Sequence, residues 1–91
     1  MATRSRAQDA FIADGAGQGL SRGDLAVLAY VDRLYLYRLT VERQDIFEAQ
    51  QDQPGRIVDV DDCGQVAIAF DAGGAEHVFW VEPRWLRRQP L

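Results

Sequence analysis

The sequence predicts an all-β protein, a small antiparallel barrel of about five strands that is closed or partly open. Its 91 residues allow one domain with one core. The clearest evidence lies between Pro54 and Leu86, where three short segments of alternating apolar residues are joined by two tight turns. Two further apolar runs, residues 25–31 and 34–41, are rich in the β-branched and aromatic residues that strands favour.

Residues 1–20 contain few apolar side chains and four glycine or serine residues. We therefore expect a flexible N-terminal segment over residues 1–20 and a barrel domain over residues 21–91. Phe11 and Ile12 could dock one short strand of this segment. It contains arginines but no apolar stretch of 7–15 residues, so the sequence does not indicate a secretory signal.

The apolar runs at residues 25–31 and 34–41 are expected to form two of the strands. In each run, alternate residues would share one face: Leu25, Val27, Ala29 and Val31 in the first, and Tyr35, Tyr37, Leu39 and Val41 in the second. The opposite faces are also apolar, which indicates strands covered on both sides. Asp32-Arg33 lacks the glycine or asparagine that two-residue hairpins favour. These two residues therefore form either a hairpin turn or a kink in one long strand.

Residues 42–53 are more polar and predict either a short helix or a loop. Asp45 and Glu48 have the spacing of a helix N-cap and its N3 partner, and Pro54 would end the helix after about two turns. A loop anchored by Phe47 is the alternative.

From Gly55 onward the alternation becomes regular and predicts three strands. The turn Asp62-Cys63-Gly64 separates the first two strands, and the glycines of residues 71–75 allow the positive φ of a hairpin loop. Pro83 ends the pairing, and Trp85-Leu86 can fold back to plug the barrel end. The alternating residues are Val58 and Val60, then Val66, Ile68 and Phe70, then Val78 and Trp80 against His77, Phe79 and Val81.

Three stretches resemble bacterial SH3-like barrels over roughly residues 23–88. They are Gly23-Asp24 followed by LAVLAYV, the run GRIVDVDDCGQVAIAFD at residues 55–71, and the closing VEPRWL at residues 81–86. Barrels of this kind include ribosome-associated modules, small subunits of redox enzymes and plasmid toxins, but the decisive motif of each group is absent. The resemblance therefore implies a fold and not a particular activity.

Composition and charge exclude several classes of protein. The net charge of −4 argues against a general nucleic-acid binder, because phosphate affinity depends on clustered cations. A single cysteine, Cys63, excludes an internal disulfide and a cysteine-rich zinc site. No apolar run approaches the ~18–20 residues of a membrane span. We expect a cytoplasmic protein.

The sequence offers weak candidates for a metal site or a catalytic site. Asp59, Asp61 and Asp62 begin like a calcium loop, but Phe70 stands where a bidentate carboxylate is required. Cys63 and His77 would lie at opposite ends of one strand, roughly 20 Å apart at ~3.3 Å per residue. We therefore predict no catalytic residues, no metal and no cofactor, and a protein that is not an enzyme.

Large aromatic side chains are numerous for so small a core. They could fill the barrel, or two or three could form an exposed ridge for a protein partner or a second copy. The runs 35–37 and 78–81 are apolar on both faces, so we expect apolar surface left over around Phe79 and Trp80. The predicted partner-binding residues are Tyr35, Tyr37, Phe79, Trp80, Trp85, Arg84, Arg87 and Arg88.

Charge is segregated along the chain. Residues 42–62 carry seven acids and two arginines, whereas residues 83–91 carry three arginines and no acid. This pattern fits solvated faces, or electrostatic complementarity between protomers or with an acidic partner.

The hypothesis that follows is a non-enzymatic binding or accessory module, docking a protein partner or forming a homodimer. Alternatives are an accessory subunit of a larger enzyme complex and a toxin-like or nucleic-acid-associated barrel.

Overall fold

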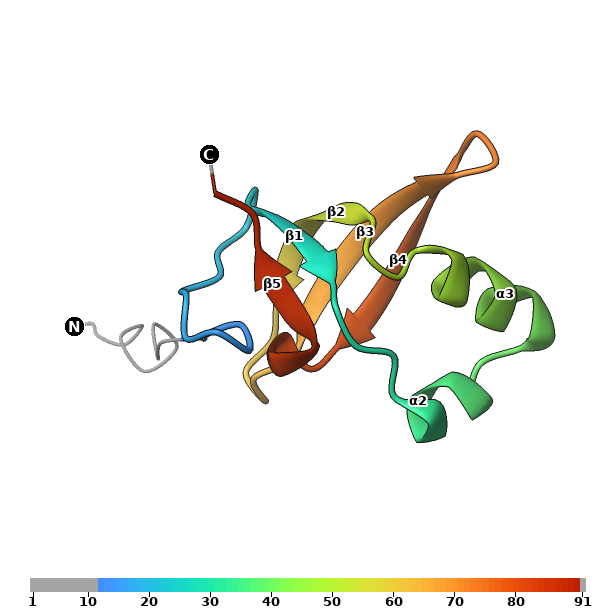
Figure 1. The fold of residues 1–91 in the computed structure, drawn as a ribbon, viewed down its shortest axis with the longest axis horizontal. Coiled ribbons are helices and arrows are strands. Elements are labelled where there is room, and N and C mark those ends of the chain that lie inside the picture. The colour runs from blue at the N-terminus through green and yellow to red at the C-terminus, as the bar shows by residue number, and fades with distance from the viewer. Residues whose placement is uncertain (1–11, 91) are drawn as a thin grey trace.

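A five-stranded antiparallel sheet is the framework of the computed structural model, which describes residues 12–90 (Figure 1). Its spatial order is β4-β3-β2-β1-β5, so a meander of β2, β3 and β4 is extended by β1 and β5. Within residues 12–90 no pairing joins the edge strands β4 and β5, so the sheet does not close into the expected barrel. The strands are β1 (Leu25–Leu28), β2 (Pro54–Val60), β3 (Val66–Ala72), β4 (Ala75–Val81) and β5 (Leu86–Arg88).

The β2–β3–β4 meander confirms the three strands expected from the alternation. β3 and β4 pair without interruption from Val66↔Val81 to Ala72↔Ala75. Gly73 and Gly74 close this hairpin with φ of 61° and 81°, as a type I′ turn requires. A bulge between Ile57 and Asp59 shifts the register of β2, so Ile57 fills the core in place of the expected Val58.

Residues 34–41 are not a strand, and this prediction was wrong. The region holds two helices, α2 (Arg33–Tyr37) and α3 (Val41–Ala49). The Asp32 carboxylate accepts a hydrogen bond from the Tyr35 N–H at 3.0 Å, and the Thr40 hydroxyl accepts one from the Arg43 N–H at 3.3 Å. These side chains are N-caps, which satisfy amide groups that a helix start leaves unpaired.

The other boundaries in this region also differ from those expected. β1 ends at Leu28 rather than residue 31. A short helix in the long loop is confirmed, but it starts after Thr40 and ends at Ala49, so Asp45 is not its N-cap and Pro54 does not end it.

Residues 12–20 belong to the folded domain, whereas residues 1–11 of the expected flexible segment lie outside the described residues. Ala13 and Gly19 form an isolated antiparallel bridge, and Leu20 is buried in the core. The Gly15 N–H donates to the Leu86 carbonyl at 3.0 Å. Figure 1 shows this segment running beside β5, on the side of the sheet away from the two helices.

The apolar surplus expected around Phe79 and Trp80 is covered at Phe79 by the chain itself, whereas Trp80 and its neighbour Val78 stay 39% and 37% exposed. Phe79 is buried, and its ring centroid lies 4.9 Å from that of Phe47, which is 0% exposed. Phe47 also lies 5.2 Å from Tyr35. The predicted exposure of Phe79 was wrong because α3, which was not expected to start at residue 41, packs Phe47 against the sheet.

Trp80 lies on the opposite face of β4, where it remains partly exposed. Its cross-strand neighbour is the buried Ala67. Trp85 ends one turn of 3₁₀ helix (Pro83–Trp85) and Leu86 begins β5, and both side chains are buried in the core as expected, although the sheet of residues 12–90 has no closed barrel end for them to plug.

Candidate functional site

A cleft of about 470 Å³ opens where the N-terminal turn, the segment after β1 and the 3₁₀ turn meet. We call it the Tyr30–Trp85 cleft. It brings together three of the predicted partner-binding residues, Arg84, Trp85 and Arg87, which are close in sequence. The lining residues are Gly15, Tyr30, Asp32, Arg84, Trp85 and Arg87.

The two aromatic walls are held by backbone hydrogen bonds. The N–H groups of Ala29 and Tyr30 both donate to the Trp85 carbonyl, at 2.9 and 3.2 Å. The rings of Tyr30 and Trp85 are 6.5 Å apart and inclined at 58°. Trp85 also packs edge-on against Tyr35 at 5.2 Å and is buried, whereas Tyr30 is 54% exposed. Trp85 is therefore the rigid wall of the cleft, and Tyr30 is the wall that a ligand can reach.

Arg87 is fixed in the cleft by the backbone. Its Nη1 donates to the carbonyls of Leu86 at 2.9 Å and Arg84 at 3.1 Å. Gly15 makes room for this arrangement, because a Cβ there would lie 2.5 Å from the Arg84 carbonyl and would clash with the Arg87 guanidinium. The Arg87 charge is thus held in one place.

The cleft is locally basic in an acidic protein. Arg84 is exposed at its rim, and Arg87 lies beside it. Asp32 is the one acid in the lining, and its carboxylate caps α2. Two arginines against one acid contrast with the net charge of −4 for the chain.

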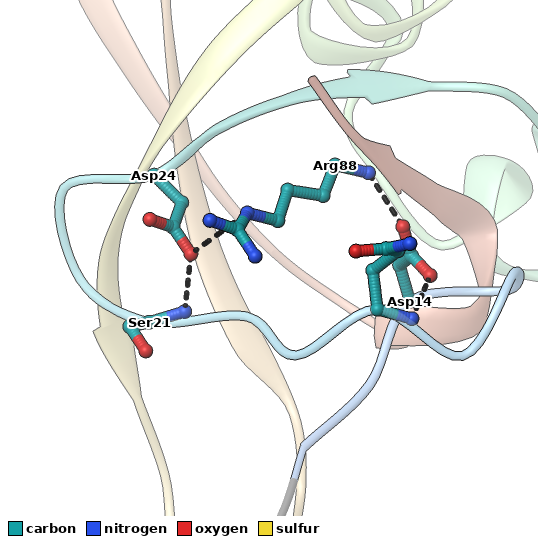
Figure 2. A network of polar contacts seen from close by, with 5 residues as sticks. Asp14, Ser21, Asp24 and Arg88 are labelled. Carbon is teal, nitrogen blue, oxygen red and sulfur yellow. Dashed lines mark hydrogen bonds and ion pairs between the residues drawn. The ribbon is translucent and has the colours of Figure 1, made fainter. Parts of the chain in front are cut away.

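Arg88 has a structural role outside the cleft lining. Its N–H donates to the buried Asp14 carboxylate at 2.6 Å, and its Nε lies 3.7 Å from Asp24 (Figure 2). Asp24 in turn accepts a hydrogen bond from the Ser21 N–H at 2.9 Å. These contacts join the N-terminal segment to β5.

Asp14 anchors this network. Its carboxylate also accepts hydrogen bonds from the N–H groups of Ala16 at 2.8 Å and Gln18 at 2.9 Å. Burial raises the pKa of Asp14, but the three backbone hydrogen bonds and the nearby Arg87 charge outweigh it. The net result is a pKa below the ordinary value.

The remaining predicted binding residues do not line the cleft. Phe79 is buried in the core, and Tyr35 is half-buried beside Phe47. Burial raises the pKa of the Tyr35 hydroxyl, which the Arg43 charge partly opposes. Tyr37 is exposed on α2, and Trp80 lies on the outer face of β4. The structure therefore divides the eight predicted residues among the core, the cleft, two other surfaces and, for Arg88, the network with Asp14 and Asp24.

The described residues hold no cluster of three or more potential metal ligands. Asp59 pairs with Arg22 at 2.6 Å, and the Asp61 carboxylate accepts hydrogen bonds from the backbone of its own turn. Cys63 lies in the turn before β3, whereas His77 pairs with Phe70 toward the other end of that strand. The acidic side chains Asp59 and Asp61 are thus engaged in contacts that shape the β2–β3 end of the sheet.

Tyr30 and Asp32 were missing from the predicted site. Asp32 stands just before the apolar run that begins at Leu34, and Asp is one of the residues favoured as a helix N-cap at such a position. Reading that signal would have placed Tyr30 in the connection before a helix rather than near the end of a strand.

The chain matches no protein-family model, and no curated protein or solved structure is significantly similar to it. Among the helices of residues 12–90, none has the length and apolar character needed to cross a membrane.

Proposed function

We propose that this chain is a non-enzymatic binding module that holds a short extended segment of a protein partner in the Tyr30–Trp85 cleft. The observation that carries the proposal is the pairing of two inclined aromatic walls with two arginines in one cleft of about 470 Å³. The scaffold is proposed to be an open SH3-like barrel. Its support is the five-strand order, with β1 between β2 and β5, and the 3₁₀ turn leading into β5.

The aromatic walls favour an apolar or aromatic side chain of the ligand. Tyr30, which is 54% exposed, offers the contact area, and the buried Trp85 holds the base of the cleft rigid behind it. Aromatic residues of this kind lose little conformational entropy on binding, and interfaces are enriched in them. Trp85 is already immobilised by Tyr35 and by the backbone hydrogen bonds at its carbonyl. A ligand would therefore have to order mainly the exposed Tyr30 ring and the exposed Arg84 side chain.

The arginines favour an acidic group next to that apolar side chain. Arg87 is held by two backbone carbonyls, which leaves its other guanidinium N–H groups facing the cleft region. Guanidinium groups pair well with carboxylates. We therefore expect the ligand to be a peptide with an aromatic or apolar residue beside an acidic one.

Binding of nucleic acid through the C-terminal arginines is less well supported. Arg88 is engaged with Asp14 and Asp24, so only Arg84 and the N–H groups of Arg87 that the backbone carbonyls do not take are left for a phosphate. Phosphate binding needs several accessible cations.

Selection from a random peptide library displayed on phage would test the proposal. Peptides retained by the wild-type protein should carry an acidic residue next to an apolar one, and their affinity should be measured by calorimetry. Tyr30→Ala and Arg84→Ala should each lower the affinity at least about tenfold, as truncation of interface residues of this kind does.

Trp80→Ala is the matched control, because Trp80 is a partly exposed aromatic residue on the outer face of β4. It should leave the peptide affinity unchanged. Circular dichroism should show that all three variants keep the fold. The proposal fails if no peptide is retained above the level of a Tyr30→Ala/Arg84→Ala variant, or if Trp80→Ala weakens binding as much as Tyr30→Ala does.

A further inference from the structure

The outer side of the two helices carries an apolar surface that the chain leaves uncovered. Leu34, Tyr37 and Val41 are 74%, 63% and 71% exposed, more than any other large apolar residue described in residues 12–90. They occupy α2 and the first position of α3. We call these three residues the helical patch.

Helix geometry explains why these side chains face solvent. In α2 the buried residue is Leu36, and Leu34 projects from nearly the opposite side at 100° per residue. In α3 the buried residue is Phe47, and Val41 projects well away from it. Each helix therefore uses one side to cover the sheet and presents the other to solvent.

Opposite charges flank the helical patch. Arg33 and Arg38 are exposed at the two ends of α2. Asp45 and Glu48 are exposed on α3, four and seven residues after Val41, and so lie on the same side of that helix. The basic residues thus belong to α2 and the acidic residues to α3, and each helix also carries part of the helical patch.

We propose that the helical patch is the interface of a homodimer, in which α2 of each copy lies against α3 of the other. A two-fold axis brings the same surface of both copies together. A residue on α2 of one copy therefore meets a residue on α3 of the other. Arg33 and Arg38 of each protomer would then face Asp45 and Glu48 of its partner, with the helical patch between them.

The charge arrangement favours a second copy over an unrelated protein. A surface made of one basic helix and one acidic helix is complementary to itself when a two-fold rotation places α2 of one copy against α3 of the other. Complementary charges across an interface fix its register and speed association. Asp45 and Glu48 of α3 and the two arginines of α2 thus have a common role in the proposed dimer.

This interface shares no residue with the lining of the Tyr30–Trp85 cleft, although Asp32 of that lining is the N-cap of α2. None of the three patch residues lines the cleft, and none of the cleft residues belongs to the patch. The dimer can therefore be tested independently of the proposed peptide binding.

Charge reversal in two separate variants provides the test. Light scattering over a concentration series at low salt should show the wild-type chain at twice its mass of 10.2 kDa. The variants Arg33→Glu/Arg38→Glu and Asp45→Lys/Glu48→Lys should each be monomeric, because both helices then carry the same sign. Mixing the two variants should restore a heterodimer, since every contact regains an opposite charge.

Two further variants complete the experiment. Tyr37→Ala should raise the dissociation constant of the dimer at least about tenfold, whereas Arg56→Glu, a reversal of an exposed arginine on β2, should leave it unchanged. A wild-type chain that stays monomeric at every concentration overturns the proposal. So does a dimer that survives either double reversal, or two variants that stay monomeric when mixed. Tyr30→Ala should still form the dimer in light scattering, which separates this test from that of the cleft.

Discussion

Replacing Phe47 should cost more stability than any change on the exposed faces of the helices, because Phe47 closes the core over β4. The side chain is 0% exposed, and its ring lies 5.2 Å from Tyr35 and 4.9 Å from Phe79. Phe47→Ala removes the ring and leaves a cavity, which typically costs about 3–5 kcal/mol. Phe47→Leu keeps most of the volume and loses the two ring contacts, at about 0.5–1.5 kcal/mol each.

These values are large compared with the stability expected for a chain of this size. Natural domains have about 0.05–0.15 kcal/mol per residue, or about 5–14 kcal/mol for 91 residues. Phe47→Ala should therefore remain folded only marginally, whereas Phe47→Leu should fold with a reduced free energy of unfolding. Unfolding in urea, followed by circular dichroism and tryptophan fluorescence at one fixed protein concentration, would measure both.

Glu76→Ala is the control for this comparison, since Glu76 lies exposed on the same strand as Phe79. Its effect should be within about 0.5 kcal/mol. The reasoning is refuted if Phe47→Ala loses less than about 1 kcal/mol, or if Phe47→Leu is as damaging as Phe47→Ala. Either result would mean that α3 does not close the core through this ring.

Two further predictions concern the N-terminal turn. Asp14→Asn should lower stability by about 1–3 kcal/mol at pH 7, because one carboxylate oxygen accepts from Arg88 and the other from Ala16 and Gln18, whereas an amide has a single accepting oxygen and turns its NH2 toward one of these donors. Since the folded-state pKa of Asp14 lies below its unfolded value of about 3.9, this contribution is complete above that value. It disappears as the pH falls through the folded pKa, so urea unfolding of the two proteins should converge at acid pH. A difference that persists unchanged at pH 2 would contradict this explanation. Gly15→Ala should cost about 1–3 kcal/mol, because its Cβ meets the Arg84 carbonyl at 2.5 Å, whereas Ala16→Ser, at an exposed neighbour, should change little. Equal thermal stability of these two variants would show that the turn can move away from the cleft.

The β2–β3–β4 meander could be predicted because its information is local. Apolar alternation of period two and a Gly-Gly turn suffice to define a hairpin, and Val66–Ala72 with Ala75–Val81 follow that pattern. Even here the bulge after Ile57 escaped prediction, because one extra residue in a strand depends on how it packs.

The helices could not be recognised from residue preference. Leu34, Tyr35, Leu36 and Tyr37 have the composition of a strand, and no single face of the run is polar. The N-caps Asp32 and Thr40 are weak signals in sequence, and they gain force only when Leu36 and Phe47 are buried against the sheet.

The candidate site was predicted only in part for the same reason. Arg84, Trp85 and Arg87 are close in sequence, so their proximity could be foreseen. Tyr30 and Gly15 reach the cleft from distant segments, through hydrogen bonds to the carbonyls of Trp85 and Leu86.

The sequence by itself therefore determined an antiparallel sheet with its central hairpin, a small single core and an acidic chain with a basic C-terminal end. The tertiary structure decided that α3 covers Phe79, that Arg88 is structural and that Tyr30 joins Trp85 in a cleft. The physical reason is that alternation and turn residues act over a few neighbours, whereas burial of an aromatic ring depends on which distant segment reaches it.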